Sequence, residues 1–322
     1  MSFKPIIIVA GEPNSIFLEI LFKIFKRKKI KSPLVLIASL KILHLQMKKL
    51  NFKKKVKILD FKKINHYKLN NDTINLINVE YDQKKAFEKI SNKSNNYIKK
   101  CFDIAIILLK SNYSNRLING PISKKNFLKK KFLGITEYFA KKFNKKKVAM
   151  LIYNNDLSVS PLTTHLPLKK VSKAINKKLI FEKVQLIDKF YKTHMGIKPK
   201  IAITGLNPHC ESISKFNEDE KIIEPTIKIL KKRKFKVFGP FAADTIFLKK
   251  SRKKFNVILG MYHDQVLTPI KTLFEYDAIN ITLGLPFLRV SPDHGPNENM
   301  LGKNLSNYLS LYKAITFLEK IK

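Results

Sequence analysis

Short runs of Val, Ile and Leu alternate with longer amphipathic stretches along most of this 322-residue chain, and this alternation constrains the fold more than any other feature. It is typical of α/β proteins, in which buried strands are connected by helices. Strands are predicted at 5–10, 34–37, 56–59, 116–118, 148–153, 157–162, 200–204, 257–260 and 279–283. Helices are predicted from an N-cap at Ser15 to residue 25, and at 86–110 with a break at 92–96, 166–195, 218–232 and 305–321.

Length and cysteine content narrow the class of protein further. A chain of 322 residues is long enough to form two lobes. No apolar stretch is long enough to cross a bilayer, and the N-terminal sequence lacks the long apolar region and cleavage site of a signal peptide. Only Cys101 and Cys210 are present, so no disulfide framework is expected. We therefore expect a cytoplasmic protein without a membrane partner.

The net charge of +40 would suit a protein that binds polyanions, because 64 basic residues face 24 acidic ones. The lysines, however, are spread along nearly the whole chain among abundant Asn, Ile and Phe, and no RNA- or DNA-binding motif accompanies them. We expect a solvated basic surface with non-specific adhesion to nucleic acid at low salt, and no specific nucleic-acid partner. A basic nucleic-acid-binding protein is kept as a competing hypothesis.

Polar, turn-forming phrases follow several of the predicted strands. In open α/β sheets, ligands bind outside the carboxyl ends of the strands, so these phrases predict one composite site. The phrases are Gly11-Glu12-Pro13, Asn119-Gly120-Pro121, Gly205-Leu206-Asn207-Pro208-His209 and Met261-Tyr262-His263-Asp264.

Three of the chain's 7 histidines lie in such phrases: His165 in SPLTTHLP, His209 in ITGLNPHCE and His263 in ILGMYHDQ. Imidazole is the commonest side-chain ligand of catalytic divalent metals, and three ligands would leave positions open for a substrate. Taken singly, each could be a surface or hydrogen-bonding residue, since no close-spaced motif such as HExxH fixes the geometry. Cys210 is either a fourth ligand or a small buried residue.

Charged and polar residues cluster in the relatively lysine-poor segment 255–296, which contains Lys271, Asn280 and Arg289. Lysine and arginine suit a phosphate or carboxylate, as a point charge and a planar fork respectively. Asp244, in GPFAADTIF, is either a helix N-cap or a residue that orients the substrate or a metal-bound group. No G-x-G-x-x-G fingerprint or P-loop is present, so a nicotinamide cofactor would not bind through a standard Rossmann turn.

Taken together, the phrases resemble those of the 4-hydroxythreonine-4-phosphate dehydrogenase family of pyridoxal phosphate biosynthesis, almost from end to end. The matching phrases are GEP, NGPISK, GITE, TTHLPL, GLNPH, GPFAADTIF, MYHDQ with Lys271, and NITLGLPFLR followed by DHG. The resemblance implies an isocitrate/isopropylmalate dehydrogenase-like fold with two α/β/α lobes and a central cleft. The expected lobes are 1–130 with 290–322, and 131–289. It also implies a homodimer whose metal site is completed across the subunit interface.

The resemblance assigns roles by position. His165, His209 and His263 match the ligands of a divalent metal, for which Zn is the first choice and Mg or Co are alternatives. The expected nicotinamide cofactor is NAD, with NADP as the alternative. The catalytic pair is Asp244 and Lys271. The predicted substrate-binding positions are Ile135, Thr136, Lys271, Asn280 and Arg289. The predicted contact with the cofactor adenosine is Asp293-His294-Gly295.

Several positions depart from the family pattern. Ile135 stands where the family has a histidine that helps to hold the substrate, so substrate binding could be weaker or the substrate could differ. Ser15 and Phe17 replace glycines, and Asn119 replaces a threonine. The other replacements are Cys210 with Glu211 and Pro296 with Asn297, both at positions of small residues.

The implied reaction is NAD-dependent oxidation of 4-phosphooxy-L-threonine, followed by decarboxylation to 3-amino-2-oxopropyl phosphate. A bound metal would lower the pKa of the alcohol and stabilise the enolate. Lys271, Asp264 and a water chain are the candidates for the general base. A sister dehydrogenase acting on threonate or erythronate 4-phosphate is the main alternative, favoured by Ile135.

Overall fold

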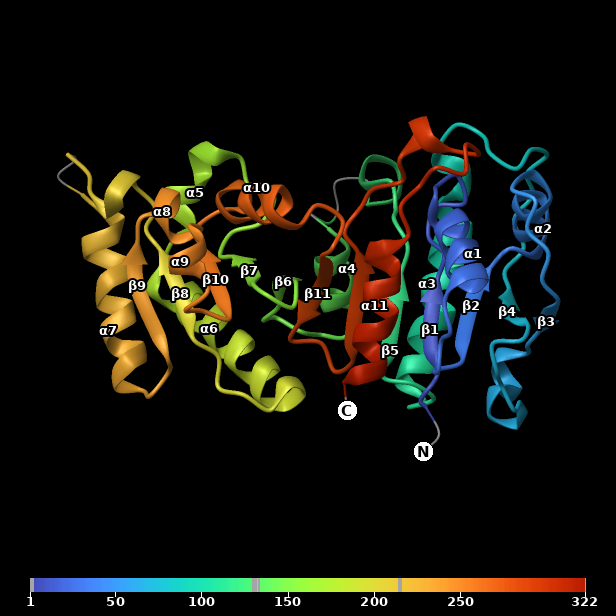
Figure 1. Ribbon diagram of the computed structural model, residues 1–322, viewed down its shortest axis with the longest axis horizontal. Helices are drawn as coiled ribbons and strands as arrows, with labels where there is room; N and C mark the ends of the chain where they lie inside the picture. The colour runs from blue at the N-terminus through green and yellow to red at the C-terminus, as the bar shows by residue number, and fades with distance from the viewer. Residues whose placement is uncertain (1–2, 129–131, 133, 214–215, 322) are drawn as a thin grey trace. The chain divides into compact units, whose positions relative to one another are not determined.

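The computed structural model describes residues 3–128, 132, 134–213 and 216–321. The chain forms two compact units (Figure 1): unit 1 comprises Met1–Leu133 and Pro286–Lys322, and unit 2 comprises Gly134–Leu285. Arg289 therefore lies in unit 1, whereas the boundary expected at residue 289 assigned it to the second lobe. No helix in the described ranges combines the length and apolar character needed to cross a membrane.

Unit 1 is built on a parallel sheet with the strand order β3-β4-β2-β1-β5-β12. Helix α3 covers β1 and β2, and α11 contacts β5 and β12 (Figure 1). The strand β1 is completely buried, which explains its continuous apolar sequence. The strands are β1 (Ile6–Val9), β2 (Leu34–Ala38), β3 (Val56–Ile58), β4 (Ile74–Asn78), β5 (Arg116–Asn119) and β12 (Leu288–Pro292). The helices are α1 (Phe17–Arg27), α2 (Leu40–Lys49), α3 (Asn95–Lys110) and α11 (Leu309–Lys320).

Unit 2 has a mixed sheet with the strand order β11-β6-β7-β10-β8-β9. The strands β7, β10, β8 and β9 are parallel, whereas β6 is antiparallel to both of its neighbours. The strands are β6 (Ala149–Tyr153), β7 (Ser158–Pro161), β8 (Ile201–Thr204), β9 (Val237–Phe241), β10 (Val257–Gly260) and β11 (Ile279–Leu283). The helices are α4 (Ile135–Lys142), α5 (Val171–Ala174), α6 (Lys177–Phe190), α7 (Glu224–Lys232), α8 (Ala243–Ile246), α9 (Lys249–Arg252) and α10 (His263–Phe274).

Helix α10 is anchored to the sheet by its apolar side. It contacts β7 and β10, and its residues Val266 and Ile270 are completely buried with Val159, Ala202 and Ile258. Because His263 is the first residue of this helix, the same packing holds one of the predicted metal ligands at the edge of the sheet.

The predicted α/β class is confirmed, but the predicted ranges do not include helices α2, α4, α8, α9 and α10 or strands β4, β9 and β12. The strands that were not predicted contain polar residues, glycine or proline, which interrupt the apolar pattern of a strand. Asn75 lies in the middle of β4 and is buried because its side-chain amide donates to the carbonyls of Leu34 and Asn70. Arg289 interrupts the apolar run of β12, and Gly239 and Pro240 lie inside β9.

Three predicted helix boundaries were wrong. Helix α1 begins at Phe17 with Ile16 at its N-cap, although the hydroxyl of Ser15 does accept from the Phe17 amide at 3.3 Å. The predicted helix at 86–110 begins only at Asn95, because the preceding segment binds the loop after β1, with the Glu88 amide donating to Asn14. The C-terminal helix, expected from residue 305, begins at Leu309.

Candidate active site

The three histidines follow three adjacent parallel strands of unit 2. His165 follows β7, His263 follows β10 and His209 follows β8, and β10 is paired with both of the other strands. Since the carboxyl ends of parallel strands meet at one edge of a sheet, all three histidines belong to the same edge. The sequence predicted three strand-end histidines, and the topology places the strands that precede them side by side.

The rings of His165 and His263 lie with their centroids 5.6 Å apart. With metal–nitrogen bonds of about 2.0–2.1 Å, two imidazoles on one tetrahedral ion place their ring centroids about 5 Å apart, so this pair fits a shared ion. Within the described residues, however, no group of three or more His, Cys, Asp or Glu side chains is close enough to hold one. The structure thus brings two of the predicted ligands together, while the complete triad stays a prediction.

Asp264 orients the ring of His263. Its Oδ1 atom lies 2.6 Å from His263 Nδ1. A carboxylate on one ring nitrogen fixes the tautomer and leaves the other nitrogen available for a metal, an arrangement typical of metal-ligating histidines. The His263 side chain is 36% exposed, so its free edge is accessible.

The backbone at His165 and His209 is left-handed, with φ angles of 56° and 54°. Residues other than glycine rarely adopt this conformation, and when they do they are concentrated at functional sites. This conformation was not foreseen from the sequence.

Asp219 holds the loop that carries His209, and sequence reasoning missed it. This carboxylate is 1% exposed and accepts three hydrogen bonds, from the amides of Leu206 and Asn207 at 2.8 and 3.1 Å and from the Asn207 side chain at 2.9 Å. Each bond to a buried carboxylate is charge-assisted. The only signal in the sequence was an acid at the start of the predicted helix 218–232.

The surroundings of Cys210 favour its protonated thiol. Burial raises the pKa of its thiol, and the negative charges of Asp219, Asp244 and Glu211 raise it further. A metal binds the thiolate, which these effects disfavour.

Thr136 and Asn280 are brought together on one side of unit 2. The hydroxyl of Thr136, in the first turn of α4, lies 3.2 Å from that of Thr282 on β11. Asn280 shares a face of β11 with Thr282, because it is two residues away. The Oδ1 atom of Asn280 is buried and has no hydrogen-bond partner among the described residues, as expected for a group that binds a ligand.

Ile135, beside Thr136, is the first residue of α4, and the preceding Gly134 lies against the ring of His165. An ideal Cβ built on Gly134 would be 3.3 Å from His165 Cε1. The position where the family has a histidine is therefore next to a predicted metal ligand.

The two predicted catalytic residues lie in different parts of unit 2. Lys271 is on α10, about two helical turns or about 12 Å along the axis from His263. Asp244 is exposed in α8. The alternative role of Asp244 as a helix N-cap is wrong, because Ala242 occupies that position.

The remaining predicted residues lie in unit 1. Arg289 is 1% exposed on β12, and its Nε atom donates to Asn119 Oδ1 on β5 at 2.7 Å. The Asp293 amide donates to Ser310 Oγ, and His294 Nδ1 lies 2.9 Å from the Gly295 carbonyl. The polar phrases expected at one sheet edge thus fall into two groups, one in each unit.

Within unit 1, the phrases after β1 and β5 are in direct contact. The Glu12 amide donates to the Pro121 carbonyl at 2.9 Å. A Cβ on Gly11, whose φ is +79°, would lie 2.4 Å from that same oxygen, so only glycine allows this approach.

The buried carboxyl of Glu12, in this contact region, should make the stability of the protein depend on pH. Its carboxyl is 2% exposed and accepts from Ser94 at 3.0 Å, and burial raises its pKa above the usual 4.5. The folded state therefore favours the protonated acid, a stabilising contribution that is present below about pH 4.5 and lost as the pH rises through the folded-state pKa. The side chain of Glu12→Gln is neutral at every pH. The stability of this variant relative to the parent should therefore increase as the pH rises from about 4 to about 7. Thermal melts at both pH values check this, and a pH-independent difference would contradict it.

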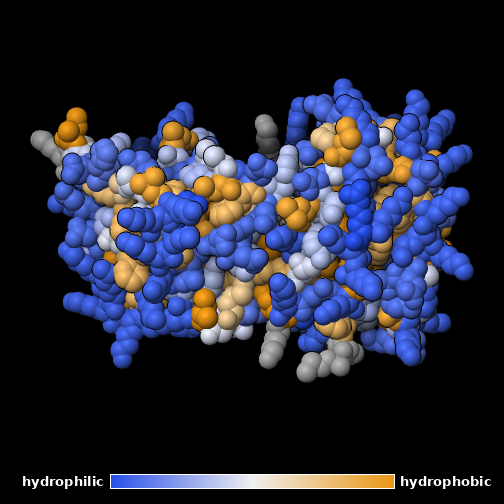
Figure 2. All heavy atoms as spheres, viewed as in Figure 1, coloured by the Kyte–Doolittle hydropathy of each residue, from blue (hydrophilic) through white to orange (hydrophobic). Residues whose placement is uncertain are grey.

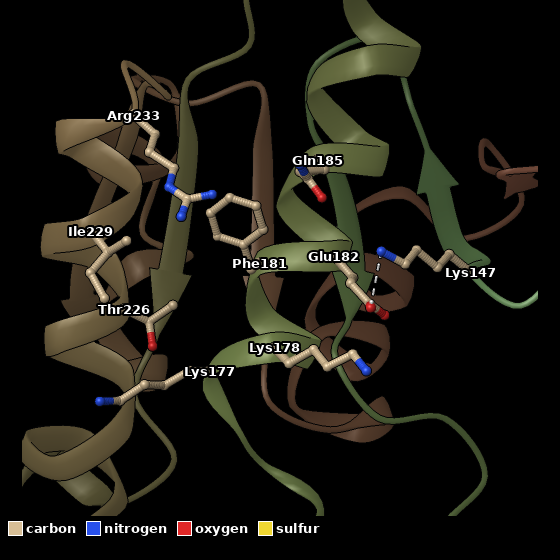
Figure 3. A pocket seen from close by; sticks show the side chains of 9 residues that line it. All are labelled: Lys147, Lys177, Lys178, Phe181, Glu182, Gln185, Thr226, Ile229 and Arg233. Atoms are coloured by element: carbon tan, nitrogen blue, oxygen red, sulfur yellow. Dashed lines mark ion pairs between the residues drawn. The ribbon is translucent and has the colours of Figure 1, made fainter.

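A shallow pocket of about 310 Å³ lies elsewhere in unit 2, on α6 and α7 (Figure 3). Arg233 lies over the ring of Phe181 at 4.6 Å, and Lys147 pairs with Glu182 at 3.2 Å. None of the predicted site residues lines this pocket. Its walls are long, mostly charged side chains, and we assign it no part in the chemistry.

Comparisons with known proteins show which proteins the chain is similar to. The chain is 42% identical over 206 residues to a 4-hydroxythreonine-4-phosphate dehydrogenase from Sulfurihydrogenibium sp., and the matched part spans 63% of each chain, less than two thirds of the relative. It is 34% identical over 327 residues to one from Aquifex aeolicus, covering 99% of this chain and 98% of the relative. A D-threonate 4-phosphate dehydrogenase from Pectobacterium atrosepticum is 33% identical over 61% of each chain.

Comparison with solved structures shows the fold class of the protein. A 4-hydroxythreonine-4-phosphate dehydrogenase from Klebsiella pneumoniae matches with a TM-score of 0.85 at 25% identity, over 99% of this chain and 98% of that one. An isocitrate dehydrogenase from Methylococcus capsulatus shares the fold alone, with a TM-score of 0.51 at 8% identity, over 98% and 84%. The protein is thus an oxidoreductase with an isocitrate-dehydrogenase-like α/β fold. The family model "Pyridoxal phosphate biosynthetic protein PdxA" matches residues 29–318, and the chain belongs to this family.

Proposed function

We propose that this protein is an NAD-dependent, divalent-metal-dependent dehydrogenase that oxidises 4-phosphooxy-L-threonine and releases 3-amino-2-oxopropyl phosphate after decarboxylation, in the cytoplasm. The observation that carries the proposal is the placement of His165, His263 and His209 after three adjacent parallel strands in a member of the PdxA family. A bound divalent ion would supply Lewis-acid polarisation of the alcohol oxygen, and a bound nicotinamide would supply the hydride acceptor.

The chain's own residues bind and orient the substrate in this proposal. Asn280 offers a buried acceptor without a partner among the described residues, and Thr136 offers a hydroxyl beside it. Arg289 supplies a fork, and Lys271 a point charge, for the phosphate and carboxylate. Asp264 is already bonded to His263 Nδ1, which favours Lys271 or a water chain over Asp264 as the proton acceptor. Asp293, His294 and Gly295 are proposed to contact the cofactor.

The second candidate is a sister dehydrogenase for threonate or erythronate 4-phosphate. Two observations favour it: Ile135 cannot donate the hydrogen bond of the family histidine, and one relative carries the name D-threonate 4-phosphate dehydrogenase. Both candidates use the same metal and cofactor chemistry, so only the substrate separates them.

A panel of the three phosphates with Zn²⁺, Mg²⁺ or Co²⁺ distinguishes the candidates through NADH formation. We expect turnover with 4-phosphooxy-threonine, and we expect Ile135→His to raise its kcat/KM roughly 10–100-fold, as for one restored hydrogen bond to a charged group. Preference for threonate phosphate in the parent would support the sister enzyme. Lack of NADH with every substrate, together with steeply salt-dependent nucleic-acid binding, would support the nucleic-acid binder instead.

We also propose a homodimer whose partner subunit completes the metal site, because the described residues of one chain supply only two adjacent histidines. Large apolar side chains are exposed in the loops of unit 2 that follow β7, β8 and β9, and hydrophobic spheres at the upper left of Figure 2 lie over the loop between β8 and α7. Such exposure at a site is typical of a protein interface. The residues are Leu168, Ile213, Phe216 and Leu248.

Charge at this surface should separate the subunits. We expect Ile213→Glu combined with Phe216→Glu to shift the mass in sedimentation equilibrium from two chains to one, and to lower zinc affinity. Leu305→Glu is the control, because Leu305 is equally apolar and 72% exposed but lies in unit 1. A parent that sediments as one chain would refute the dimer.

A further inference from the structure

Gln265, in the first turn of α10, links the loops that carry the histidines. Its side chain is buried, with the residue 9% exposed. The Oε1 atom accepts from the Thr204 hydroxyl at 2.8 Å and from the Met261 amide at 2.6 Å, and Nε2 donates to the Gly205 carbonyl at 2.9 Å. One amide therefore forms three hydrogen bonds with three other residues.

These bonds join two of the histidine-bearing loops. Thr204 ends β8, and Gly205 begins the loop that leads to His209. Met261 follows β10 and lies two residues before His263. The same carboxamide therefore fixes how far the backbone of one loop lies from the backbone of the other.

The third loop is attached to this arrangement through Met261. The Met261 carbonyl accepts from the Thr163 amide at 3.3 Å and from the Thr163 hydroxyl at 2.8 Å. Thr163 lies two residues before His165. All three loops are thus connected by one continuous set of hydrogen bonds that ends at Gln265.

A carboxamide suits this place better than the alternatives. It accepts two hydrogen bonds and donates one, whereas a carboxylate cannot donate to Gly205 and a thioether leaves the buried Thr204 hydroxyl and two backbone groups without partners.

We propose that Gln265 is a positioning residue that holds the loops carrying His209 and His263 in place, in each subunit of the proposed dimer, and thereby sets the metal affinity of the site. The role rests on the proposed metal-dependent function. Gln265 contacts neither substrate nor metal in this role and acts only through the two loops. Its replacement should therefore weaken metal binding by the factor of about 10–100 that is usual for residues supporting metal ligands.

Zinc affinity, measured by chelator competition on the full-length protein, tests the role without relying on turnover. We expect Gln265→Met and Gln265→Glu to bind Zn²⁺ about 10–100-fold more weakly than the parent. Gln46→Met is the matched control, because Gln46 is also a buried glutamine with two donated hydrogen bonds, but it lies in α2 of unit 1. It should lose stability and keep its zinc affinity.

A milder variant covers the case in which Gln265 variants fail to fold. Thr204→Val removes one hydroxyl of similar volume, and a several-fold loss of zinc affinity is expected. Unchanged affinity in a folded Gln265→Met, or in Thr204→Val if that variant alone folds, overturns the positioning role and leaves the proposed function intact. A parent that binds no zinc overturns both.

Discussion

His209→Ala should abolish metal-dependent NADH formation while leaving the protein folded. The side chain is exposed in the short helical turn Pro208–Cys210 that follows β8, so its removal creates no cavity. It is a predicted metal ligand on the same sheet edge as His165 and His263, and a metal held by two imidazoles in place of three binds far more weakly. We expect activity to fall by at least about three orders of magnitude, the scale of effects when a catalytic group is lost. The measurement is NADH formation at saturating substrate and metal.

Two further variants separate ligand loss from backbone strain. His209 has a φ of 54°, where alanine costs about 1 kcal/mol but glycine costs little, so His209→Gly should be equally inactive and no less stable than His209→Ala. His44→Ala, which changes an exposed histidine of α2, should keep full activity. Wild-type turnover by His209→Gly in metal-replete buffer would exclude a metal role for this residue.

Arg289→Met should raise the KM for the phosphorylated substrate at least 100-fold. Arg289 is the predicted anion fork, and its guanidinium is held at Nε by Asn119 Oδ1 at 2.7 Å. Each hydrogen bond to a charged group contributes about 1.5–3 kcal/mol, so the two bonds of a fork account for about two to four orders of magnitude in affinity. Initial rates over a wide range of substrate concentration measure the effect.

Arg116 offers a control in the neighbouring strand. It is 7% exposed on β5, and its Nη2 atom donates to the Ile321 carbonyl at 2.7 Å. Arg116→Met therefore also removes a buried guanidinium and its hydrogen bond, and it should lower the melting temperature without changing KM. If both variants lowered stability alone, Arg289 would be a structural residue and the proposed anion contact would be wrong.

Much of the fold could be predicted from apolar periodicity, and the failures have physical causes. Strands such as β1 and β10 are buried on both faces and consist of apolar residues alone, so they are visible in the sequence. In contrast, β4 and β12 contain Asn75 and Arg289, whose side chains donate hydrogen bonds to residues far away in the chain. A single sequence does not show that such partners exist, so these two segments were not predicted to be strands.

The sequence predicted the candidate functional residues of the site but not the residues that support them. The identities of the histidines, of Lys271 and of Arg289 followed from phrases in the sequence. The residues that support them did not, because Asp219 and Gln265 act on backbone groups of loops whose proximity depends on strand order. Hydrogen bonds between residues about sixty positions apart, such as that from Gln265 to Gly205, carry no local signature.

By itself, the sequence determined the α/β class, the chemistry of the candidate ligands and their positions after predicted strands. These properties are local, because residue type and periodicity alone set them. Only the tertiary structure decided that β7, β10 and β8 are neighbours, that His165 lies against His263, and that Gln265 links the loops between them. Strand order and loop contacts depend on packing between distant segments, since many pairings bury the same apolar surface.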